Sequence, residues 1–526
     1  MLRSVCPFNS RSVKSMIACV AFALGSILSS LAATERPNIL WIMSDDHARQ
    51  AVGAYGGRLA PLNPTPTIDR LAREGVRFDN VFCSNSICTP SRATLLSGQY
   101  SHVNGVRTLT DAIAPDKVVL PHVLSDLGYQ TAMIGKWHLH VEPTGFDYYC
   151  VLPGQGTYFN PEFFDQNAGK WPDNRRQMIG KVLGKADAAL HADDAITDLS
   201  LHWLSERDTS KPFFLMHHFK SPHGNWENPE STDFLYENTY IPEPHTLRGG
   251  PVTGSPSTEG LGSSIGKRNL KRNIGMQMRV DQDMEAEAYE TAAYQRYLKK
   301  YLRCVRGVDD NIGRLIDYLE STGELDNTII LYTSDQGQLT GEHDYYDKRW
   351  MYEESLRMPF IVRYPPAIKA GLISDAMITN VDFAPTLIDL AGGEAPGSMQ
   401  GRSFKTMIHG GDAPDDWREA VYYRYWMQLA HHYVPAHYGI RTTDHKLIFY
   451  YGLPLDASGA VPEQSPAGWQ FFDLSRDPDE TIDLYRDPKY TETIASLKDE
   501  LLELKAEIGD TDERYPELMA VREQAW

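Results

Sequence analysis

The chain carries charged and amide side chains directly after four segments that are predicted to be buried strands. These strands are predicted at residues 36–44, 129–134, 211–217 and 327–334 from their short apolar runs. Open α/β sheets bind ligands at the carboxyl ends of their strands, so the residues that follow are expected to meet at one edge of a sheet. They are Asp45, Asp46, Lys136, His138, His223, Asp335 and Gln336.

Four of these residues offer oxygen ligands: Asp45, Asp46, Asp335 and Gln336. Carboxylate and amide oxygens are hard donors that suit calcium or magnesium better than zinc. The pair Asp45-Asp46 taken alone is equally typical of a turn or a helix cap. Together with the other strand ends, it indicates a site for a divalent cation.

A fifth segment supplies a candidate nucleophile, Cys88, just ahead of a helix predicted at residues 91–96. Pro90 fits there because an N–H in the first turn of a helix has no partner to lose. The free N–H groups and the helix dipole favour an oxyanion on the side chain of residue 88. Arg92, four residues on, is expected to hold an anionic group against it. On these residues alone, a structural or disulfide role for Cys88 in an exported protein stays open.

The remaining pattern predicts a scaffold in two parts. Alternating strands and helices up to about residue 395 imply an α/β fold, with a large, mostly parallel sheet covered by helices on both faces. After that point, short strands without intervening helices and a helix at 491–508 predict a smaller antiparallel sheet with a helix packed on it. We therefore expect a catalytic domain at 34–395 and a C-terminal α+β subdomain at 396–526.

The sequence also predicts one irregular segment and a set of further helices and strands. Residues 225–271 are rich in Pro, Gly, Ser and Asn, which predicts an irregular insertion that shapes substrate binding. The other helices are predicted at 67–74, 120–127, 194–206, 286–321 and 382–390, and the other strands at 78–82, 358–364, 420–426, 437–441, 446–451 and 469–474.

Residues 1–33 are typical of a secretory signal peptide. Arg3, Arg11 and Lys14 precede an apolar stretch at 16–28, and small residues follow at 30–33. No later segment is long enough to span a bilayer as a helix, so no integral membrane segment is expected after cleavage. The sequence has no Asn-x-Ser/Thr acceptor, which favours a bacterial periplasmic or extracellular protein.

The net charge and the number of cysteines argue against two further classes of protein, nucleic-acid-binding proteins and disulfide-rich proteins. The formal charge is −19, and it becomes −22 without the three leader cations, whereas a nucleic-acid-binding protein needs a basic footprint. Without the leader four cysteines remain, too few for a disulfide framework, and at most one bridge forms if Cys88 is modified. They are Cys83, Cys88, Cys150 and Cys304.

An ordered set of motifs resembles the type I sulfatases, the formylglycine-dependent members of the alkaline phosphatase superfamily. The first motif is Cys-x-Pro-x-Arg at 88–92. The resemblance as a whole covers the chain from about residue 36 to beyond residue 484. The other motifs are Gly-Lys-Trp-His at 135–138, Ser-Pro-His at 221–223, Thr-Ser-Asp-Gln-Gly-Gln-x-x-Gly-Glu-His at 333–343, Asp-Lys-Arg-Trp at 347–350 and Phe-Asp-Leu at 472–474.

The resemblance implies a nucleophile and a cofactor. A maturation enzyme would oxidise Cys88 to formylglycine; one hydroxyl of its hydrate would attack sulfur, and deprotonation of the other would later expel sulfate. One Ca²⁺ would be bound by Asp45, Asp46, Asp335, Gln336 and residue 88. Gln336 stands where many members have Asn or His, but it still offers an oxygen.

The resemblance also implies roles for the charged residues of the site. Arg92 would hold the formylglycine hydrate, with support from Lys136. His138 would be the base that collapses the sulfated intermediate. His223 and Lys348 would hold sulfate oxygens, and His223 would protonate the leaving alcohol.

Two further segments indicate the substrate. Residues 143–156 and 437–448 resemble N-acetylglucosamine-6-sulfatases more than generic arylsulfatases, so a 6-O-sulfated N-acetylglucosamine in a glycan is expected. His343 and His437 are expected to contact the substrate. Other plausible pocket residues are Tyr149, Tyr158, Trp226, Trp426, His431 and His432.

Three alternatives remain open at this stage. The chain could be a sulfatase for another sulfated polysaccharide, or a phosphonate or phosphate monoester hydrolase on the same fold. It could also be a glycan-binding protein with an inactive site. Two-zinc phosphatases are disfavoured, because they need further histidine ligands and a Ser or Thr nucleophile, where this chain has Gln336 and Cys88.

Overall fold

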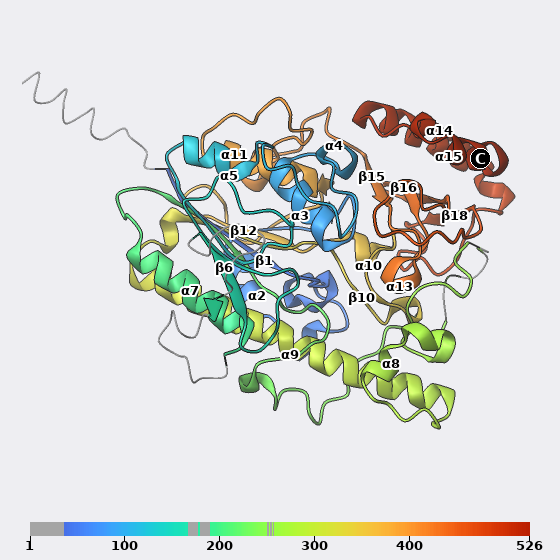
Figure 1. Ribbon diagram of the computed structural model, residues 1–526, viewed down its shortest axis with the longest axis horizontal. Helices are drawn as coiled ribbons and strands as arrows, with labels where there is room; N and C mark the ends of the chain where they lie inside the picture. The colour runs from blue at the N-terminus through green and yellow to red at the C-terminus, as the bar shows by residue number, and fades with distance from the viewer. Residues whose placement is uncertain (1–35, 167–176, 179–189, 250–251, 253–254, 256) are drawn as a thin grey trace, which may run out of the picture. The chain divides into compact units, whose positions relative to one another are not determined.

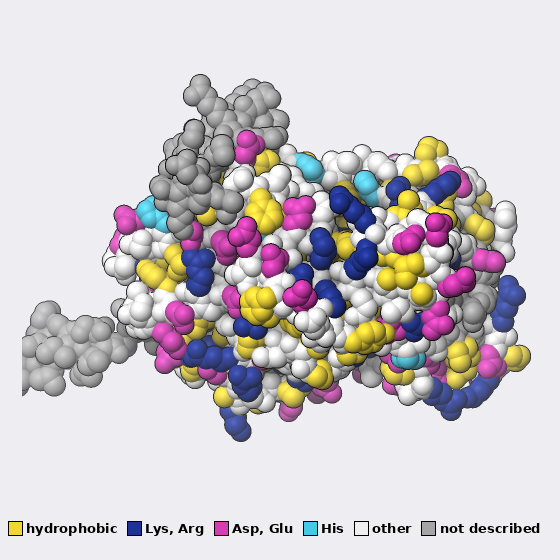
Figure 2. All heavy atoms as spheres, turned by 90° about the horizontal axis from the view of Figure 1, so that it is seen from below, with side chains coloured by type: hydrophobic (Ala, Val, Ile, Leu, Met, Phe, Trp, Pro, Cys, Tyr) yellow, Lys and Arg dark blue, Asp and Glu magenta, His cyan; other side chains and the backbone are white. Residues whose placement is uncertain are grey.

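The computed structural model describes residues 36–166, 177–178, 190–249, 252, 255 and 257–526 (Figure 1). The signal peptide expected at 1–33 lies outside the described residues. Residues 38–526 form one compact unit, and the domain boundary expected near residue 395 stays a prediction. Within the described part of the chain, no helix has the length and apolar character needed to cross a membrane. On the face shown in Figure 2, Asp and Glu side chains lie among the Lys and Arg side chains.

The centre of this unit is a mixed sheet with ten described strands, in the order β13-β2-β12-β9-β1-β8-β4-β5-β6-β7. The five strands from β9 to β5 run parallel to one another, and antiparallel pairs occur on both sides of them. The strands are β13 (Leu372–Ser374), β2 (Val76–Phe78), β12 (Phe360–Arg363), β9 (Thr328–Ser334), β1 (Asn38–Ser44), β8 (Phe213–His218), β4 (Gln130–Lys136), β5 (Tyr148–Leu152), β6 (Glu162–Asp165) and β7 (Gln177–Met178).

Helices cover both faces of this sheet, which confirms the predicted fold class (Figure 1). Side chains alternate along each strand, so in β1 Ile39, Trp41 and Met43 enter one core, whereas Leu40 and Ile42 enter the other. The first core is closed by α3 (Cys88–Ser97), α5 (Leu120–Asp126) and α11 (Phe383–Leu390), and the second by α2 (Pro66–Glu74), α7 (Ala192–Glu206) and α9 (Ala286–Ser321).

The C-terminal region forms the predicted antiparallel sheet with a helix packed on it. Tyr438, Ile440, Leu447 and Phe449 share one hydrophobic cluster with apolar residues of α14, such as Leu501. The elements are β15 (Ala420–Tyr425), β16 (His437–Thr442), β17 (His445–Tyr450), β18 (Gly468–Asp473), α14 (Thr491–Ile508) and α15 (Pro516–Ala525), the last of which was not predicted.

The remaining described elements are short. Two small sheets are formed by β3 with β14 and by β10 with β11. The strands are β3 (Val81–Phe82), β14 (Ile378–Thr379), β10 (Leu339–Thr340) and β11 (Tyr346–Asp347), and the helices are α4 (Ser101–Asn104), α8 (Ile274–Gln277), α10 (Glu353–Leu356), α12 (Lys405–Ile408) and α13 (Ala430–Tyr433).

Most predicted helices and strands match the structure to within two residues at each end, and two predictions differ from it by more. The helix expected at 91–96 is α3 and begins at Cys88, because its first turn accepts Pro90 without the loss of a hydrogen bond. The strand expected at 78–82 is two strands. β2 pairs within the large sheet, whereas β3 pairs with β14, since Asp79 and Asn80 carry the chain from one sheet to the other.

Candidate active site

Parallel pairing of the central strands brings the predicted strand-end residues together. Ser44 and Ser334 are paired across β1 and β9, so Asp45 and Asp335 leave the sheet side by side. The Asp335 N–H donates to the Ser44 carbonyl at 3.2 Å, and the Asp46 N–H donates to Asp335 Oδ1 at 3.1 Å. The sequence-predicted convergence at one sheet edge is therefore present in the structure.

Asp45, Asp46 and Asp335 form an acidic cluster. Each offers a carboxylate oxygen within 4.8 Å of the others, and all three are buried. Burial, together with the neighbouring Asp45 carboxylate, raises the pKa of Asp335 to about 7. Burial likewise raises the pKa of Asp46, although Lys348 acts against it. Ionisation of Asp46 and Asp335 is therefore disfavoured beside the Asp45 carboxylate.

Gln336 gives a further indication that this cluster suits a cation. Its Nε2 donates to Asp335 Oδ1 at 2.7 Å and to Asp46, whereas its buried Oε1 has no partner. A half-turn of the amide would direct Oε1 at the two carboxylates, an arrangement that is favourable only with a cation between them. Three carboxylates and one amide oxygen fit a hard divalent ion such as Ca²⁺.

Cys88 lies against this cluster as the first residue of α3. Its sulfur is 3.4 Å from Asp45 Oδ1 and 3.8 Å from Lys136 Nζ. Burial and the Asp45 carboxylate raise the pKa of the Cys88 thiol, so the thiolate is disfavoured. As an unmodified thiol, Cys88 is therefore poorly activated for nucleophilic attack.

Three buried cations surround the acidic cluster. Arg92 donates through Nε to Asp335 Oδ2 at 3.0 Å, Lys136 forms an ion pair with Asp45, and Lys348 forms one with Asp46. Burial opposes ionisation of Asp45, but Lys136, His223 and Arg92 outweigh it and hold the pKa of Asp45 well below its usual range. These cations are positioned to neutralise an anion that enters beside Cys88.

The position of Lys136 depends on the glycine before it. Gly135 has a φ of 107°, and a Cβ there would collide with the carbonyl oxygen of His218 on the neighbouring strand. Only glycine allows β4 to end this close to β8. The Lys136 ammonium then also donates to Gln155 Oε1 at 2.6 Å, a contact that sequence reasoning did not identify.

The two predicted catalytic histidines have different surroundings. His223 Nε2 is 3.7 Å from Asp46 Oδ2, and its Nδ1 lies 2.7 Å from the Gly224 carbonyl oxygen. His138 has a φ of 57° and a buried Nδ1 without a partner. Burial lowers the pKa of both histidines well below their usual range, and Lys136 acts in the same direction on each.

A cleft of about 280 Å³ opens onto this site, and we call it the catalytic cleft. Asp46, His223 and Lys348 line it, together with Gln155. Of the plausible pocket residues, Trp226, His431 and His432 also line it. Sequence reasoning missed Asp347 and Arg349, which flank Lys348 with φ angles of 84° and 88° and also line the cleft.

The two predicted substrate contacts lie elsewhere. His343 is 2 % exposed and packs against Tyr352, with ring centroids 5.3 Å apart. His437 is fully buried among aromatic rings and lies 2.7 Å through Nδ1 from the Pro435 carbonyl oxygen. Neither lines the catalytic cleft, so their contact with the substrate stays a prediction.

Comparisons with known proteins agree with this geometry. A profile described as Sulfatase matches residues 37–393, and one described as N-sulphoglucosamine sulphohydrolase, C-terminal, matches residues 341–507. An N-acetylglucosamine-6-O-sulfatase of Bacteroides thetaiotaomicron is 38% identical over 528 residues, which cover 91% of this chain and 88% of the relative.

Solved structures extend the comparison. A protein solved in complex with its substrate D-glucosamine-2-N,6-O-disulfate superposes with a TM-score of 0.79 at 38% identity, covering 92% of this chain and all of that one. A phosphonate monoester hydrolase of Agrobacterium radiobacter has a TM-score of 0.68 at 19% identity, covering 90% and 96%, and that likeness concerns the fold alone.

Proposed function

This chain belongs to the sulfatase family, and we propose that it removes the 6-O-sulfate from N-acetylglucosamine units of sulfated glycans. The observation that carries the proposal is the position of Cys88 at the start of α3, between the acidic cluster and Lys136. The sugar is supported by the 38%-identical relative named for this activity and by the structure solved with a 6-O-sulfated glucosamine.

The proposal includes two groups that this chain would acquire. Asp45, Asp46, Asp335 and Gln336 would bind calcium, which would supply positive charge against the sulfate and the nucleophile. Cys88, oxidised to formylglycine by a maturation enzyme, would supply the hydroxyl of an aldehyde hydrate as the nucleophile.

The neighbouring residues of this chain would orient and neutralise the reacting groups. Lys136 and Arg92 flank residue 88 and would hold its oxygen atoms in place. Lys348 and His223 line the cleft and would bind the sulfate oxygens, where spread negative charge develops. His138, buried beside Lys136, would accept the proton that completes turnover.

His223 would donate the proton to the leaving alcohol. Its Nδ1 lies against the Gly224 carbonyl oxygen, which directs Nε2 toward Asp46 and the cleft. Burial disfavours the imidazolium in the free protein, and the negative charge of a bound sulfate would favour it. The proton would then become available when the substrate is in place.

We also propose that the protein is exported by a bacterium. The support is the basic, apolar and small-residue pattern of the first 33 residues, and the 38%-identical relative is bacterial. Cell fractionation with N-terminal sequencing tests this proposal. Cleavage near Ala32 or Ala33 is expected, and an intact N-terminus on a protein recovered only from the cytoplasm would contradict it.

The test of the proposed activity is sulfate release from N-acetylglucosamine-6-sulfate by protein with confirmed formylglycine at residue 88. Release that stops with a chelator and returns with calcium is expected. Release from another sulfated glycan alone would replace the proposed sugar. No release from any sulfate ester, together with hydrolysis of a phosphonate monoester, would overturn the proposed activity in favour of a phosphonate monoester hydrolase.

A further inference from the structure

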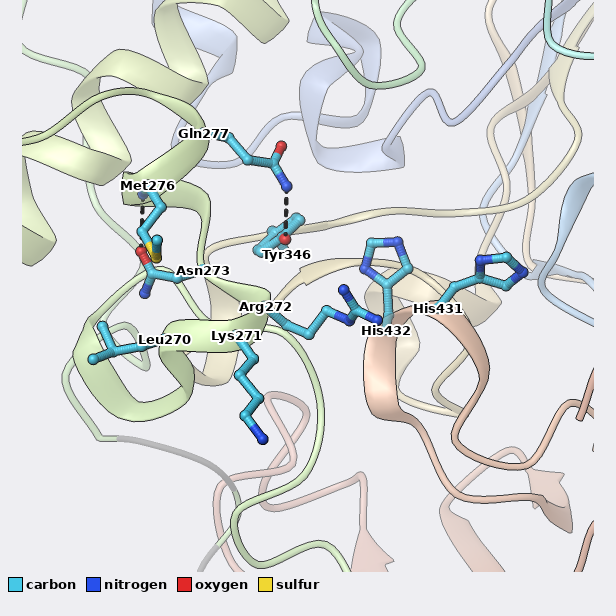
Figure 3. A pocket seen from close by; sticks show the side chains of 9 residues that line it. All are labelled: Leu270, Lys271, Arg272, Asn273, Met276, Gln277, Tyr346, His431 and His432. Atoms are coloured by element: carbon cyan, nitrogen blue, oxygen red, sulfur yellow. Dashed lines mark hydrogen bonds between the residues drawn. The ribbon is translucent and has the colours of Figure 1, made fainter. Parts of the chain in front are cut away.

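A second chamber of about 370 Å³ adjoins the catalytic cleft (Figure 3). Gln277, Tyr346, His431 and His432 line both spaces, so the two lie next to each other. The Gln277 amide donates to the Tyr346 hydroxyl at 3.2 Å, which fixes part of the shared wall. A substrate whose sulfate lies beside Cys88 can therefore extend into this chamber.

Two basic side chains line the chamber, although the chain as a whole is acidic. Lys271 and Arg272 come from the 3-10 helix η5 (Lys267–Arg272) and line the chamber. Figure 3 shows Arg272 extending toward His432 on α13, whereas Lys271 points away from His432. Neither cation forms an ion pair with any residue that the structure describes. The chain holds 70 acidic and 51 basic residues, so two unpaired cations at one cavity are a local excess of positive charge.

The carboxylate that faces His432 already has another partner. Asp347 accepts from Arg349 Nε at 2.9 Å and lies 3.5 Å from His432 Nε2. The second ring nitrogen of His432, Nδ1, is buried and has no hydrogen-bond partner among the residues that the structure describes. Arg272, Lys271 and His432 therefore remain available for an anion that the protein itself does not provide.

The opposite wall is apolar. Leu270 and Met276 line the chamber, and each is 52% exposed. A sugar ring has apolar C–H faces as well as polar edges, so such a wall suits a pyranose better than a free inorganic ion. The chamber thus combines a surface for a ring with cations for a charged substituent.

We propose that this chamber binds a second anionic group of the substrate, a sulfate or carboxylate carried on the same sugar or on the next one. This inference rests on the proposed function, because it makes the preferred substrate a glycan with at least two negative charges. Exposed ion pairs are individually weak and are screened by salt, so the chamber would set preference and would leave basal turnover in place.

The test compares three substrates on the matured enzyme. N-acetylglucosamine-6-sulfate carries one anion, glucosamine-2-N,6-O-disulfate carries two on one ring, and a disaccharide of N-acetylglucosamine-6-sulfate with a uronic acid carries the second on the neighbouring ring. The variant is Lys271→Gln/Arg272→Gln. Its matched control is Lys211→Gln/Lys369→Gln, which removes two exposed lysines that line neither space.

We expect the chamber variant to lose roughly fivefold in kcat/KM on at least one dianionic substrate, with less than about twofold change on the monoanionic one. The loss should shrink as salt is added, and the control should match the unaltered enzyme. A loss confined to the disulfated sugar assigns the anion to the same ring, and a loss confined to the disaccharide assigns it to the uronic acid. Equal losses on all three substrates, or none, would overturn the inference.

A binding measurement separates this inference from the proposed activity. Calorimetric titration of the same sugars into Cys88→Ala protein reports affinity without turnover. If no sugar is desulfated but the chamber variant still binds the dianionic sugars more weakly, the proposed activity fails and the chamber stands. If the monoanionic sugar is desulfated and the chamber variant binds all three sugars as the control does, the chamber inference fails alone.

Discussion

Two buried clusters of charged side chains in this protein differ in how their carboxylates and cations are balanced. The acidic cluster at the sheet edge places three carboxylates within 4.8 Å of one another, against three cations. A second cluster, which we call the C-terminal cluster, contains Arg424, Lys505, Asp510 and Asp512 at the packing of β15 against α14. There Arg424 donates to Asp510 Oδ1 at 2.7 Å, and Lys505 lies 2.9 Å from Asp512 Oδ1. A third cation, Arg522, also pairs with Asp512 at 2.9 Å, so cations outnumber carboxylates.

The protonation of the two clusters differs accordingly. In the C-terminal cluster burial opposes ionisation, but Arg424 and Lys505 outweigh it and hold the pKa of Asp510 below its usual range. In the acidic cluster burial and Asp45 raise the pKa of Asp335. Buried carboxylates that nearby cations hold ionised stabilise the fold, whereas buried carboxylates whose pKa stays raised despite nearby cations indicate a ligand from outside.

The largest expected effect separates the nucleophile from an ordinary buried cysteine. Cys88→Ala should lower kcat/KM for sulfate release by at least about 10³-fold, because it removes the reacting side chain while the surrounding site remains. Cys150→Ala, in the sheet core, should keep activity and cost about 1 kcal/mol of stability. Activity assays and urea unfolding measure the two effects. Comparable activity in both variants would contradict the assignment.

The next prediction exchanges one carboxylate in each cluster. Asp510→Asn should cost about 3 kcal/mol of unfolding free energy, because it leaves Arg424 buried without its charged partner. Asp335→Asn should cost less than about 1 kcal/mol in calcium-free protein, because it removes repulsion from Asp45 and leaves Arg92 3.7 Å from the Asp45 carboxylate. Urea unfolding with a chelator near neutral pH measures both. A larger loss of unfolding free energy in Asp335→Asn than in Asp510→Asn would contradict this contrast between the two clusters.

A pH series sharpens the assignment of Asp510. Its native pKa lies below the usual value of about 3.9, so its stabilising contribution is complete above that value and is lost as the pH falls through the native pKa. The stability difference between the unaltered protein and Asp510→Asn should therefore shrink as the pH falls from about 5 to about 2. A difference that stays constant or grows toward low pH would show that Asp510 is not held ionised by Arg424.

The smallest effect concerns His437. His437→Phe should change KM for the sulfated sugar by less than about twofold, since the imidazole is buried among aromatic rings that a phenyl group can join. His432→Phe, at the cleft wall, should raise KM by about fivefold through loss of a polar contact. Steady-state kinetics on the two variants decides between them. A larger effect at His437 would support its predicted substrate contact.

Much of the fold and of the catalytic cluster could be predicted from the sequence, because the information is local. The apolar run of β1 and the acidic residues that follow it are adjacent in the chain, and so are those of β9. Parallel pairing then needs only the general rule that ligands bind at the carboxyl ends of strands. In the structure α3 begins three residues before its predicted start, because Pro90 is compatible with more than one position in a first turn.

The cleft walls could not be predicted in the same way. Arg272 and His432 are 160 positions apart and meet only because η5 and α13 fold toward one space. His437 lies on β16, where successive side chains point to opposite faces of the sheet. This alternation does not show which of the two faces another layer covers, so it does not predict that His437 is buried. Its burial behind Trp350 and Tyr423 is a tertiary property.

The most direct test of the contrast between the two clusters is the calcium content of the purified protein, measured by mass spectrometry after equilibration with calcium and passage into metal-free buffer. The account predicts about one calcium ion per chain in the unaltered protein and in Asp510→Asn, and a loss of most of it in Asp335→Asn. Unaltered protein without calcium, or Asp335→Asn with a full complement, would contradict the assignment of the acidic cluster as the metal site.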